Sequence, residues 1–335
     1  CWLPVWLVMQ PRDFVNAQIL YVGIAIMFCG LLYLGLSGRT IEAAAFSIAE
    51  GTRLTGGPIW PFLFITVACG AISGFHSLAA TGTTVKQIRS EQDCRRVGYN
   101  AMILEGILAL MALLLLSTAL PRSEFLNIVY PASKGGNPIL AFSVAIGYLM
   151  HDMTGLPIAL GCVLGILVLE GFVITTLDTA VRLCRYMLEE FWRFLLGAAT
   201  PRILLNPLFN TLLSIGLMLF FALNSTIMSA WKIFGAGNQL IGALAMTVVT
   251  VWLLQRGRRY WYTLIPALAM AVTTLATLFL SLKNNIAPAG SNTWLLPGQA
   301  PLVFATALML ILSICVLALA ARRFIAARPQ PVPTT

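Results

Sequence analysis

Glycine and small polar residues interrupt the membrane-length apolar stretch 58–80 and continue just beyond its end. These residues are Gly70, Ser73, Gly74, His76, Thr83 and Thr84. Glycine weakens a helix, and hydroxyl side chains offer the freed backbone other hydrogen-bond partners. Non-helical backbone at membrane depth is tolerated only where protein buries it or where it lines a wet cavity. We therefore expect a broken helix whose freed N–H and C=O groups contact a solute or an ion.

Part of this pattern has a second interpretation. The spacing of Gly70 and Gly74 is also that of small residues that let two membrane helices pack closely. His76 titrates near neutral pH and could carry a coupling proton, or it could be a core histidine bonded to a carbonyl. Packing does not require the hydroxyl groups around the glycines, and those groups favour a binding role.

A second group of polar residues lies in and just after the apolar stretch 156–177. Glu170 is well inside the stretch, where an acid is costly and usually functional, so we expect it to carry a proton. Thr175 and Thr176 could hold a coupling cation. Asp178 and Arg182 are four residues apart, which suits an ion pair; such a pair could couple an ion or only fasten the helix end to the interface.

Two more sites belong to the same hypothesis. Glu105 lies in the stretch 99–119 and could take part in ion coupling, or it could extend toward the inner interface. Asn238 and Gln239 follow two glycines at the start of another apolar stretch. Asn238 suits the N-cap of a helix, but two adjacent amides exceed what a cap needs and could line an outer vestibule.

The composition defines the class of protein that must position these groups. Apolar residues make up 59% of the chain and charged residues 10%, with a mean hydropathy of +0.87. A soluble domain carries about 25% charged residues. The seven cysteines show no C-x-x-C pair, and the two histidines allow no zinc spacing. No soluble-enzyme motif is present, so we expect no metal, no cofactor and no enzymatic activity.

The hydropathy pattern predicts an all-α membrane protein with a single transmembrane domain. The predicted spans are 18–37, 58–80, 99–119, 156–177, 208–229, 238–254, 262–282 and 301–321. The apolar piece 138–150 is too short to cross and is predicted as an external or re-entrant helix, while 329–335 is predicted to be disordered. With the N-terminus inside, most of the 21 basic residues fall in inner segments, which also places the C-terminus inside. The net charge of +9 is thus a topology signal and implies no nucleic-acid partner.

Four stretches together resemble the carbon starvation protein A family. They are 3–14, 61–76 with 82–84, 175–179 with Arg182, and 234–236 with 238–239, in the family's order. The resemblance implies a bacterial inner-membrane transporter that takes up peptides, or pyruvate, under carbon limitation. It also implies proton or sodium coupling and a fold of two inverted five-helix repeats, in which the first helix of each repeat is broken.

Within that scheme the chain is similar to the second repeat with flanking helices, and 58–80 is the broken first helix of the repeat. The resemblance therefore implies a missing N-terminal transmembrane half. Two other classes stay open. A membrane sensor or assembly subunit would need no cavity, and an intramembrane enzyme would need Ser73 and His76 in reach of each other.

Overall fold

The computed structural model describes residues 5–55, 57–131, 136–223, 227–286 and 300–326. These residues form helices and no β-strand, which confirms the all-α prediction. The segment 329–335, predicted to be disordered, lies outside the described residues. The chain divides into two compact units, which are described separately. Unit 1 comprises Cys1–Phe46 and Val85–Leu219, and unit 2 comprises Ser47–Thr84 and Phe220–Thr335.

Among the described residues, six helices are long and apolar enough to cross a membrane. They are Gln10–Leu36, Glu91–Thr118, Ile158–Ala199, Phe234–Gln255, Trp261–Ile286 and Leu302–Ala326. Each overlaps a predicted span, and the protein is a multi-pass membrane protein. The predicted span 58–80 is instead divided between two shorter helices, and the apolar helix in 208–229 extends over Pro207–Phe220.

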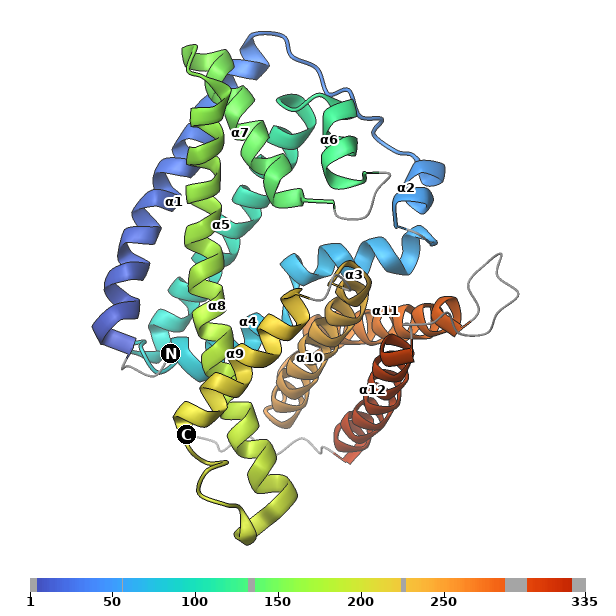
Figure 1. The fold of residues 1–335 in the computed structure, drawn as a ribbon. Coiled ribbons are helices and arrows are strands. Elements are labelled where there is room, and N and C mark those ends of the chain that lie inside the picture. Colours follow the sequence, from blue (N-terminus) through green and yellow to red (C-terminus); the bar gives the residue numbers. More distant parts are fainter. Residues whose placement is uncertain (1–4, 56, 132–135, 224–226, 287–299, 327–335) are drawn as a thin grey trace. The chain divides into compact units, whose positions relative to one another are not determined.

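Unit 1 is built around a pair of neighbouring helices, α7 and α8, with α1 beside both (Figure 1). Its helices are α1 (Val5–Leu36), α5 (Glu91–Thr118), α6 (Arg122–Val129), α7 (Pro138–Thr154), α8 (Ile158–Leu196) and most of α9 (Pro207–Leu223), with a short 3-10 turn at Gly197–Ala199. The sequence explains the ends of α7. The Asn137 side chain accepts a hydrogen bond from the Leu140 N–H at 3.0 Å, and Gly155 ends the helix with φ of 73°.

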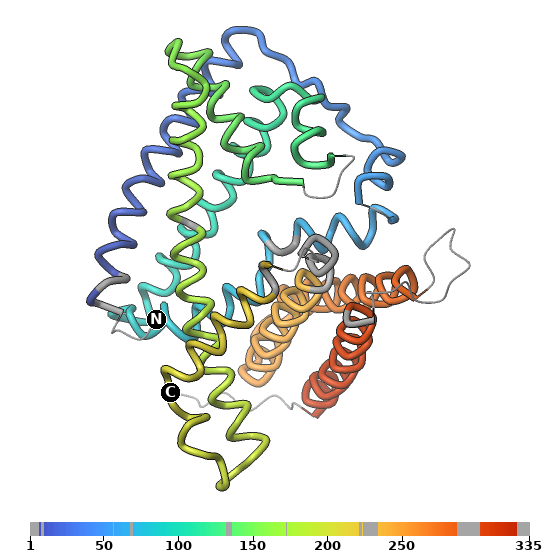
Figure 2. The backbone as a smooth tube through the Cα atoms, in the orientation of Figure 1, coloured from blue at the N-terminus to red at the C-terminus, as the bar shows by residue number. Residues whose placement is uncertain are grey.

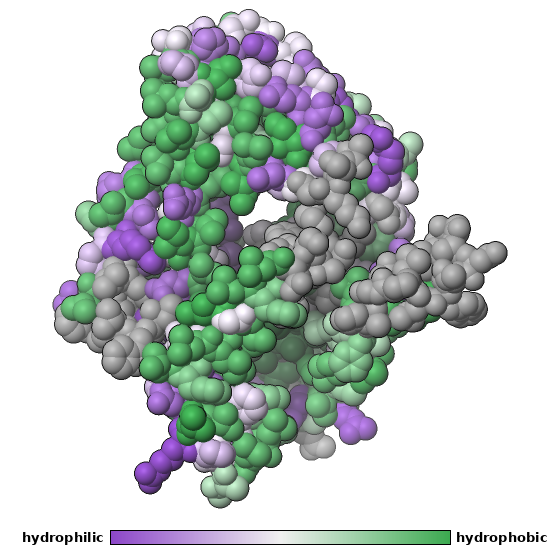
Figure 3. All heavy atoms as spheres, in the orientation of Figure 1, coloured by the Kyte–Doolittle hydropathy of each residue, from purple (hydrophilic) through white to green (hydrophobic). Residues whose placement is uncertain are grey.

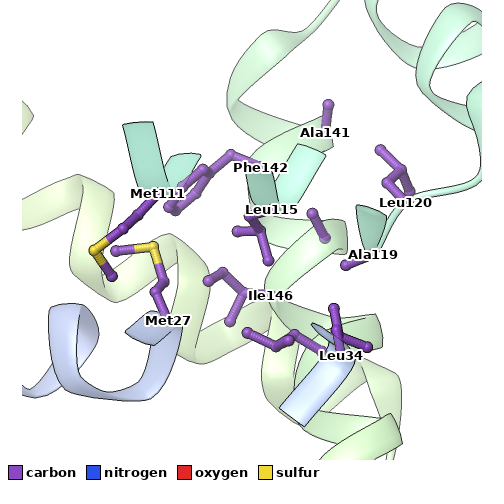
Figure 4. Close-up of a cluster of buried hydrophobic side chains, with 11 residues drawn as sticks. Met27, Leu34, Met111, Leu115, Ala119, Leu120, Ala141, Phe142 and Ile146 are labelled. Atoms are coloured by element: carbon purple, nitrogen blue, oxygen red, sulfur yellow. The ribbon is translucent and has the colours of Figure 1, made fainter. Parts of the chain in front are cut away.

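The apolar core of unit 1 joins α1, α5 and α7 (Figure 4). Met27, Leu115 and Leu149 are buried at its centre. Small residues bring α7 and α8 into close contact, because a Cβ built on Gly161 would lie 2.8 Å from the Cα of Gly147. The segment predicted as a short external or re-entrant helix is thus the start of a 17-residue helix with much of its surface buried.

Polar contacts also join helices of unit 1 near the end of α7. Arg39 forms an ion pair with Asp152 at 3.0 Å. The Tyr148 hydroxyl donates to Glu124 Oε2 of α6 at 2.9 Å. This hydrogen bond and the negative charge of Glu124 raise the pKa of the Tyr148 phenol, since both favour its neutral form.

Unit 2 contains a bundle of three long helices, α10 (Ile227–Gln255), α11 (Trp261–Ile286) and α12 (Ala300–Ala326), which Figure 2 traces as neighbours. Its first segment supplies α2 (Ile48–Thr55), α3 (Ile59–Ala71), α4 (Gly74–Ala79) and a π-helical turn at Ala80–Thr84. The α3 helix packs on α10 and α11 through a small core of Ile65, Ala236 and Leu278. The α10–α11 hairpin is also joined by a hydrogen bond from Thr250 to Thr263 at 2.8 Å.

Large apolar side chains remain exposed on both units, and apolar residues cover much of the face shown in Figure 3. Phe14 is 67% exposed in unit 1, and Phe304 is 70% exposed in unit 2. In a soluble protein such extensive apolar surface would promote aggregation. In a membrane protein it is the surface that faces lipid or neighbouring helices.

The core of unit 1 yields a stability prediction. Leu115 is fully buried, whereas Leu113 on the same helix is 64% exposed. We expect Leu115→Ala to lower the free energy of unfolding by about 2 kcal/mol, because it leaves a packing defect that lipid cannot fill. Leu113→Ala should change it by less than about 0.5 kcal/mol. Thermal unfolding in detergent compares them; equal effects would contradict the packing described here.

Candidate functional site

The segment 58–80 contains a break in its helical backbone between α3 and α4. The first helix ends at Ala71 and the second begins at Gly74, with Ser73 extended at φ −94° and ψ 124°. The Ser73 hydroxyl accepts the His76 backbone N–H at 3.4 Å and so acts as the N-cap of α4. The local sequence explains this, since serine favours caps and glycine imposes little cost where the chain leaves the helix.

Asn238 of α10 provides the second cap of α4. Its Oδ1 accepts the backbone N–H of Phe75 at 2.7 Å, and its amide group lies 3.2–3.3 Å from the Ser73 hydroxyl. The Asn238 residue is 6% exposed. Asn238 therefore satisfies backbone and hydroxyl groups that the break releases in the interior of unit 2.

This placement corrects the interpretation of Asn238 as the N-cap of its own helix. The α10 helix begins at Ile227, so Asn238 lies well inside it and caps another helix instead. The two preceding glycines also lie inside α10. A Cβ on Gly237 would lie 2.7 Å from the Cε of Met309 in α12.

The two glycines of the Gly70-x-x-x-Gly74 pattern have different environments. Gly74 is buried, and a Cβ there would lie 2.2 Å from the backbone oxygen of Asn238 and 2.8 Å from the backbone N of Gly242. A Cβ on Gly70 would meet nothing within 4 Å. The pattern is thus not a two-glycine packing motif. Gly74 alone allows α4 to approach the α10 backbone closely enough for Asn238 to cap it.

Gln239 extends the polar site along α10. It is 3% exposed, and its Oε1 has no hydrogen-bond partner among the described residues. Thr274 of α11 shares both properties, being fully buried with an unbonded hydroxyl. Gln239 lies eleven residues before Thr250, and Thr274 lies eleven residues after Thr263. Eleven residues make about three helical turns, so residues at this spacing lie on the same face of a helix. Gln239 therefore shares a face of α10 with Thr250, and Thr274 shares a face of α11 with Thr263. These are the two faces that the Thr250–Thr263 hydrogen bond joins.

Thr274 was not among the residues singled out from the sequence. The available signal was a run of hydroxyls within an apolar helix, namely Thr273, Thr274, Thr277 and Ser281, each at most 8% exposed. Thr273 and Thr277 donate to backbone carbonyls one turn earlier, as threonines in helices commonly do. The hydroxyls of Thr274 and Ser281 form no such bond among the described residues, which distinguishes them from Thr273 and Thr277.

The other predicted solute-binding residues of unit 2 are less enclosed. The His76 side chain is exposed and has an edge contact with Phe75, with ring centroids 6.0 Å apart. Thr83 and Thr84 lie in the π-helical turn, half-buried and exposed respectively. The structure therefore groups Ser73, Gly74 and Asn238, with Gln239 adjacent to Asn238 along α10.

A separate polar network lies in unit 1, between α1 and α8. The Thr175 hydroxyl donates to Asp13 Oδ1 at 3.2 Å and accepts the Asn16 amide N–H at 3.2 Å. Arg12 Nη2 lies 3.4 Å from Asp13 Oδ1 and 3.9 Å from Asp178 Oδ2. The network thus places two carboxylates beside the same guanidinium and ties the two helices together. We call these five residues the α1–α8 network.

The α1–α8 network contains only two of the predicted coupling residues, Thr175 and Asp178. Glu170 and Thr176 are exposed on α8, and Glu105 is exposed on α5. Sequence reasoning missed Arg12, Asp13 and Asn16 because it began the first span at residue 18, whereas α1 begins at Val5. Their proximity to α8 could not be seen from spacing along the chain.

The charges are distributed unequally between the two units. By sequence, unit 2 has one acidic residue, Glu50. Its basic residues are Arg53, Lys232, Arg256, Arg258, Arg259, Lys283, Arg322, Arg323 and Arg328. The other acidic residues of the chain all belong to unit 1. The capped break therefore lies in a unit that favours anions over cations.

These features define a multi-pass helical membrane protein with polar networks in its interior. The family profile described as "Carbon starvation protein CstA" matches residues 1–137 and 130–277. The chain belongs to this family, which confirms the resemblance inferred from the sequence motifs.

Characterised relatives of the chain are named as transporters. It is 29% identical to "Peptide transporter CstA" of Campylobacter jejuni, over 82% of this chain and 46% of the relative. It is also 29% identical to "Pyruvate/proton symporter BtsT" of Escherichia coli, over 84% of this chain and 49% of the relative. "Peptide transporter CstA" of Bacillus subtilis is 27% identical, over 81% of this chain and 50% of the relative. The chain spans about half the length of these curated relatives. No solved structure matches it.

The two glycines near the break provide a matched test of its geometry. We expect Gly74→Ala to lower the free energy of unfolding by about 1–3 kcal/mol, because the new methyl group overlaps the Asn238 carbonyl. Gly70→Ala should be close to neutral, since open space surrounds it. Thermal unfolding of the purified chain measures both, and a neutral Gly74→Ala variant would contradict the close approach of α4 to α10.

Proposed function

We propose that this chain forms part of a secondary transporter of the bacterial inner membrane, with both termini cytoplasmic, that imports a small carboxylate such as pyruvate, or peptides. The observation that carries the proposal is the break between α3 and α4 inside an apolar helical unit, where the Phe75 N–H donates to Asn238 and the His76 N–H donates to Ser73. The transporter names of the relatives support the same class of activity.

The solute binds at the break. Ser73 and Asn238 present hydroxyl and amide groups there, Gln239 follows Asn238 along α10, and none of the three carries a negative charge. Backbone N–H groups at the start of a helix bind carboxylates well. Because Asn238 Oδ1 already accepts the Phe75 N–H, an incoming carboxylate exchanges with this amide oxygen. The hydrogen bond from the Phe75 N–H to the carboxylate replaces its bond to Asn238, so this N–H has a partner both with and without solute.

The remaining predicted contacts belong to the same proposal. Gly70, His76, Thr83 and Thr84 lie on the segment around the break, and each is exposed or half-buried. They line the approach of the solute. Gln239 and Thr274 offer unbonded buried groups that a polar solute can satisfy.

We assign the coupling between solute uptake and proton movement to the α1–α8 network. Protonation of Asp13 or Asp178 would remove a charge that holds Arg12 and weaken the contact between the helices. A proton is favoured over sodium because the network already contains a guanidinium, and because one relative is named a pyruvate/proton symporter. Thr175 orients Asp13 within the network. The exposed Glu170, Thr176 and Glu105 have no comparable contact with the residues that the structure describes.

Solute binding is tested with the full chain in proteoliposomes. Uptake of radiolabelled pyruvate and of dialanine is measured for the unmodified chain, for Asn238→Ala and for Asn127→Ala, which changes an exposed asparagine of α6. We expect Asn238→Ala to lower uptake about tenfold or more, corresponding to about 1.4 kcal/mol, and Asn127→Ala to lower it less than twofold.

A binding measurement keeps this test decisive if uptake is slow. Pyruvate or dialanine should raise the melting temperature of the unmodified chain, and should do so less for Asn238→Ala. If neither solute shifts the melting temperature of the unmodified chain, the proposed binding of a solute by this part of the transporter is wrong. If both variants behave alike, the site is not at the break.

The coupling assignment is tested by the pH dependence of uptake. We expect uptake by the unmodified chain to rise when the outside is acidified relative to the inside. Asp13→Asn should abolish that rise, because the amide cannot exchange a proton. Glu105→Gln and Glu170→Gln serve as controls at exposed acids and should retain it. A pH response lost in either control but kept in Asp13→Asn would refute the assignment.

A further inference from the structure

Five arginines gather at one end of the three-helix bundle in unit 2. Arg256, Arg258 and Arg259 occupy the connection between α10 and α11, and Arg322 and Arg323 lie near the end of α12. All five are exposed. We call them the arginine cluster.

An aromatic contact holds the two halves of the arginine cluster together. The rings of Tyr260 and Phe324 meet edge to face, with centroids 6.0 Å apart. Tyr260 directly follows Arg259, and Phe324 directly follows Arg323. The contact therefore fixes the end of α12 beside the α10–α11 connection, although more than sixty residues separate them in the sequence.

The α10–α11 connection has a defined turn geometry. Gly257 adopts the left-handed φ of 62°, and its N–H donates to the Leu254 carbonyl at 3.1 Å. The Arg258 N–H donates to the Leu253 carbonyl at 2.9 Å. This pair of bonds is the Schellman motif, which ends a helix abruptly and satisfies its last carbonyls. Arg258 and Arg259 are thus displayed on a short, ordered turn.

Exposed aromatic residues place the arginine cluster at the depth of lipid headgroups. Trp252, Trp261 and Tyr262 are 49%, 57% and 73% exposed and lie at the ends of helices long enough to cross a membrane. Such residues are enriched where hydrocarbon meets headgroups. The Arg256 guanidinium lies 4.4 Å from the centre of the Trp252 ring, so one arginine is positioned directly on this band.

From this arrangement we infer that the arginine cluster is a binding site for the headgroup of an anionic phospholipid. Guanidinium groups bind phosphate oxygens with paired hydrogen bonds. Basic clusters at the membrane surface attract anionic lipids. Exposed apolar residues beside the cluster offer a surface for the acyl chains, among them Ile265 and Leu319 at 64% and 60% exposed. The inference does not depend on the proposed transport function.

The alternative is that these arginines only set membrane topology, as basic residues do at many inner ends of helices. The chain contains a matched pair for comparison, because Arg95 and Arg96 are adjacent, exposed and located in the first turns of α5. Two acids, Glu91 and Asp93, share those turns. The topology explanation predicts similar lipid preference for both groups, whereas the inferred site predicts it only for the arginine cluster.

The experiment measures lipid binding by the full chain in nanodiscs of phosphatidylcholine, with and without phosphatidylglycerol or cardiolipin. Native mass spectrometry counts retained lipids, and thermal unfolding reports stabilisation. We expect anionic lipid to be retained and to raise the melting temperature of the unmodified chain. The double variant Arg258→Gln/Arg322→Gln should bind it about tenfold or more weakly, and Arg95→Gln/Arg96→Gln should bind it like the unmodified chain.

Two further arms make the result decisive. Arg258→Lys/Arg322→Lys keeps the charge and should retain part of the preference, which separates recognition from misfolding. Inorganic phosphate added to the lipid-free chain in detergent should give no stabilisation. Equal loss in both glutamine double variants, no preference for anionic lipid in the unmodified chain, or stabilisation by phosphate alone would each overturn the inference.

Discussion

The need to satisfy backbone hydrogen bonds away from water governs the interior of this protein. An unmade backbone hydrogen bond in an apolar interior costs several kcal/mol, so a helix can be interrupted only where another group replaces the missing partner. At the α3–α4 break the replacements are the Ser73 hydroxyl and the buried Asn238 of α10. Gly74 makes the replacement possible, because its lack of a side chain lets the two backbones approach. The position of α4, the packing of α10 and the chemistry available to a solute all follow from this contact.

The polar groups of the two units have different characters. Unit 2 presents amides, hydroxyls and backbone N–H groups, whereas the α1–α8 network of unit 1 contains two carboxylates and an arginine. Neutral dipoles can exchange one partner for another at little cost, which suits reversible binding of a solute. Charged groups respond strongly to the gain or loss of one proton. Under the proposed function, unit 2 is thus chemically suited to binding the solute and the α1–α8 network of unit 1 to coupling.

Much of the fold was predictable, because the apolar length of a helix and the charges at its ends can be read from one continuous stretch of sequence. Six of the predicted spans correspond to long helices, and the start of α7 at Asn137 and Pro138 follows from cap chemistry. The sites were less predictable, because they depend on contacts between distant residues. Asn238 and Ser73 are 165 positions apart, so the sequence shows two polar residues but not that they bond. Likewise, Asp13 and Thr175 are 162 positions apart, and Asp13 lay outside the predicted span.

The scarcity of carboxylates in unit 2 has a consequence for how the protein withstands acid. Acid denaturation arises mainly when carboxylates that are paired in the native state take up protons. Unit 2 offers Glu50 alone for such uptake, whereas unit 1 contains the other acidic residues of the chain, including both acids beside Arg12. The two units of one polypeptide therefore differ in how many groups acid can reach, with one carboxylate in unit 2 and eleven in unit 1.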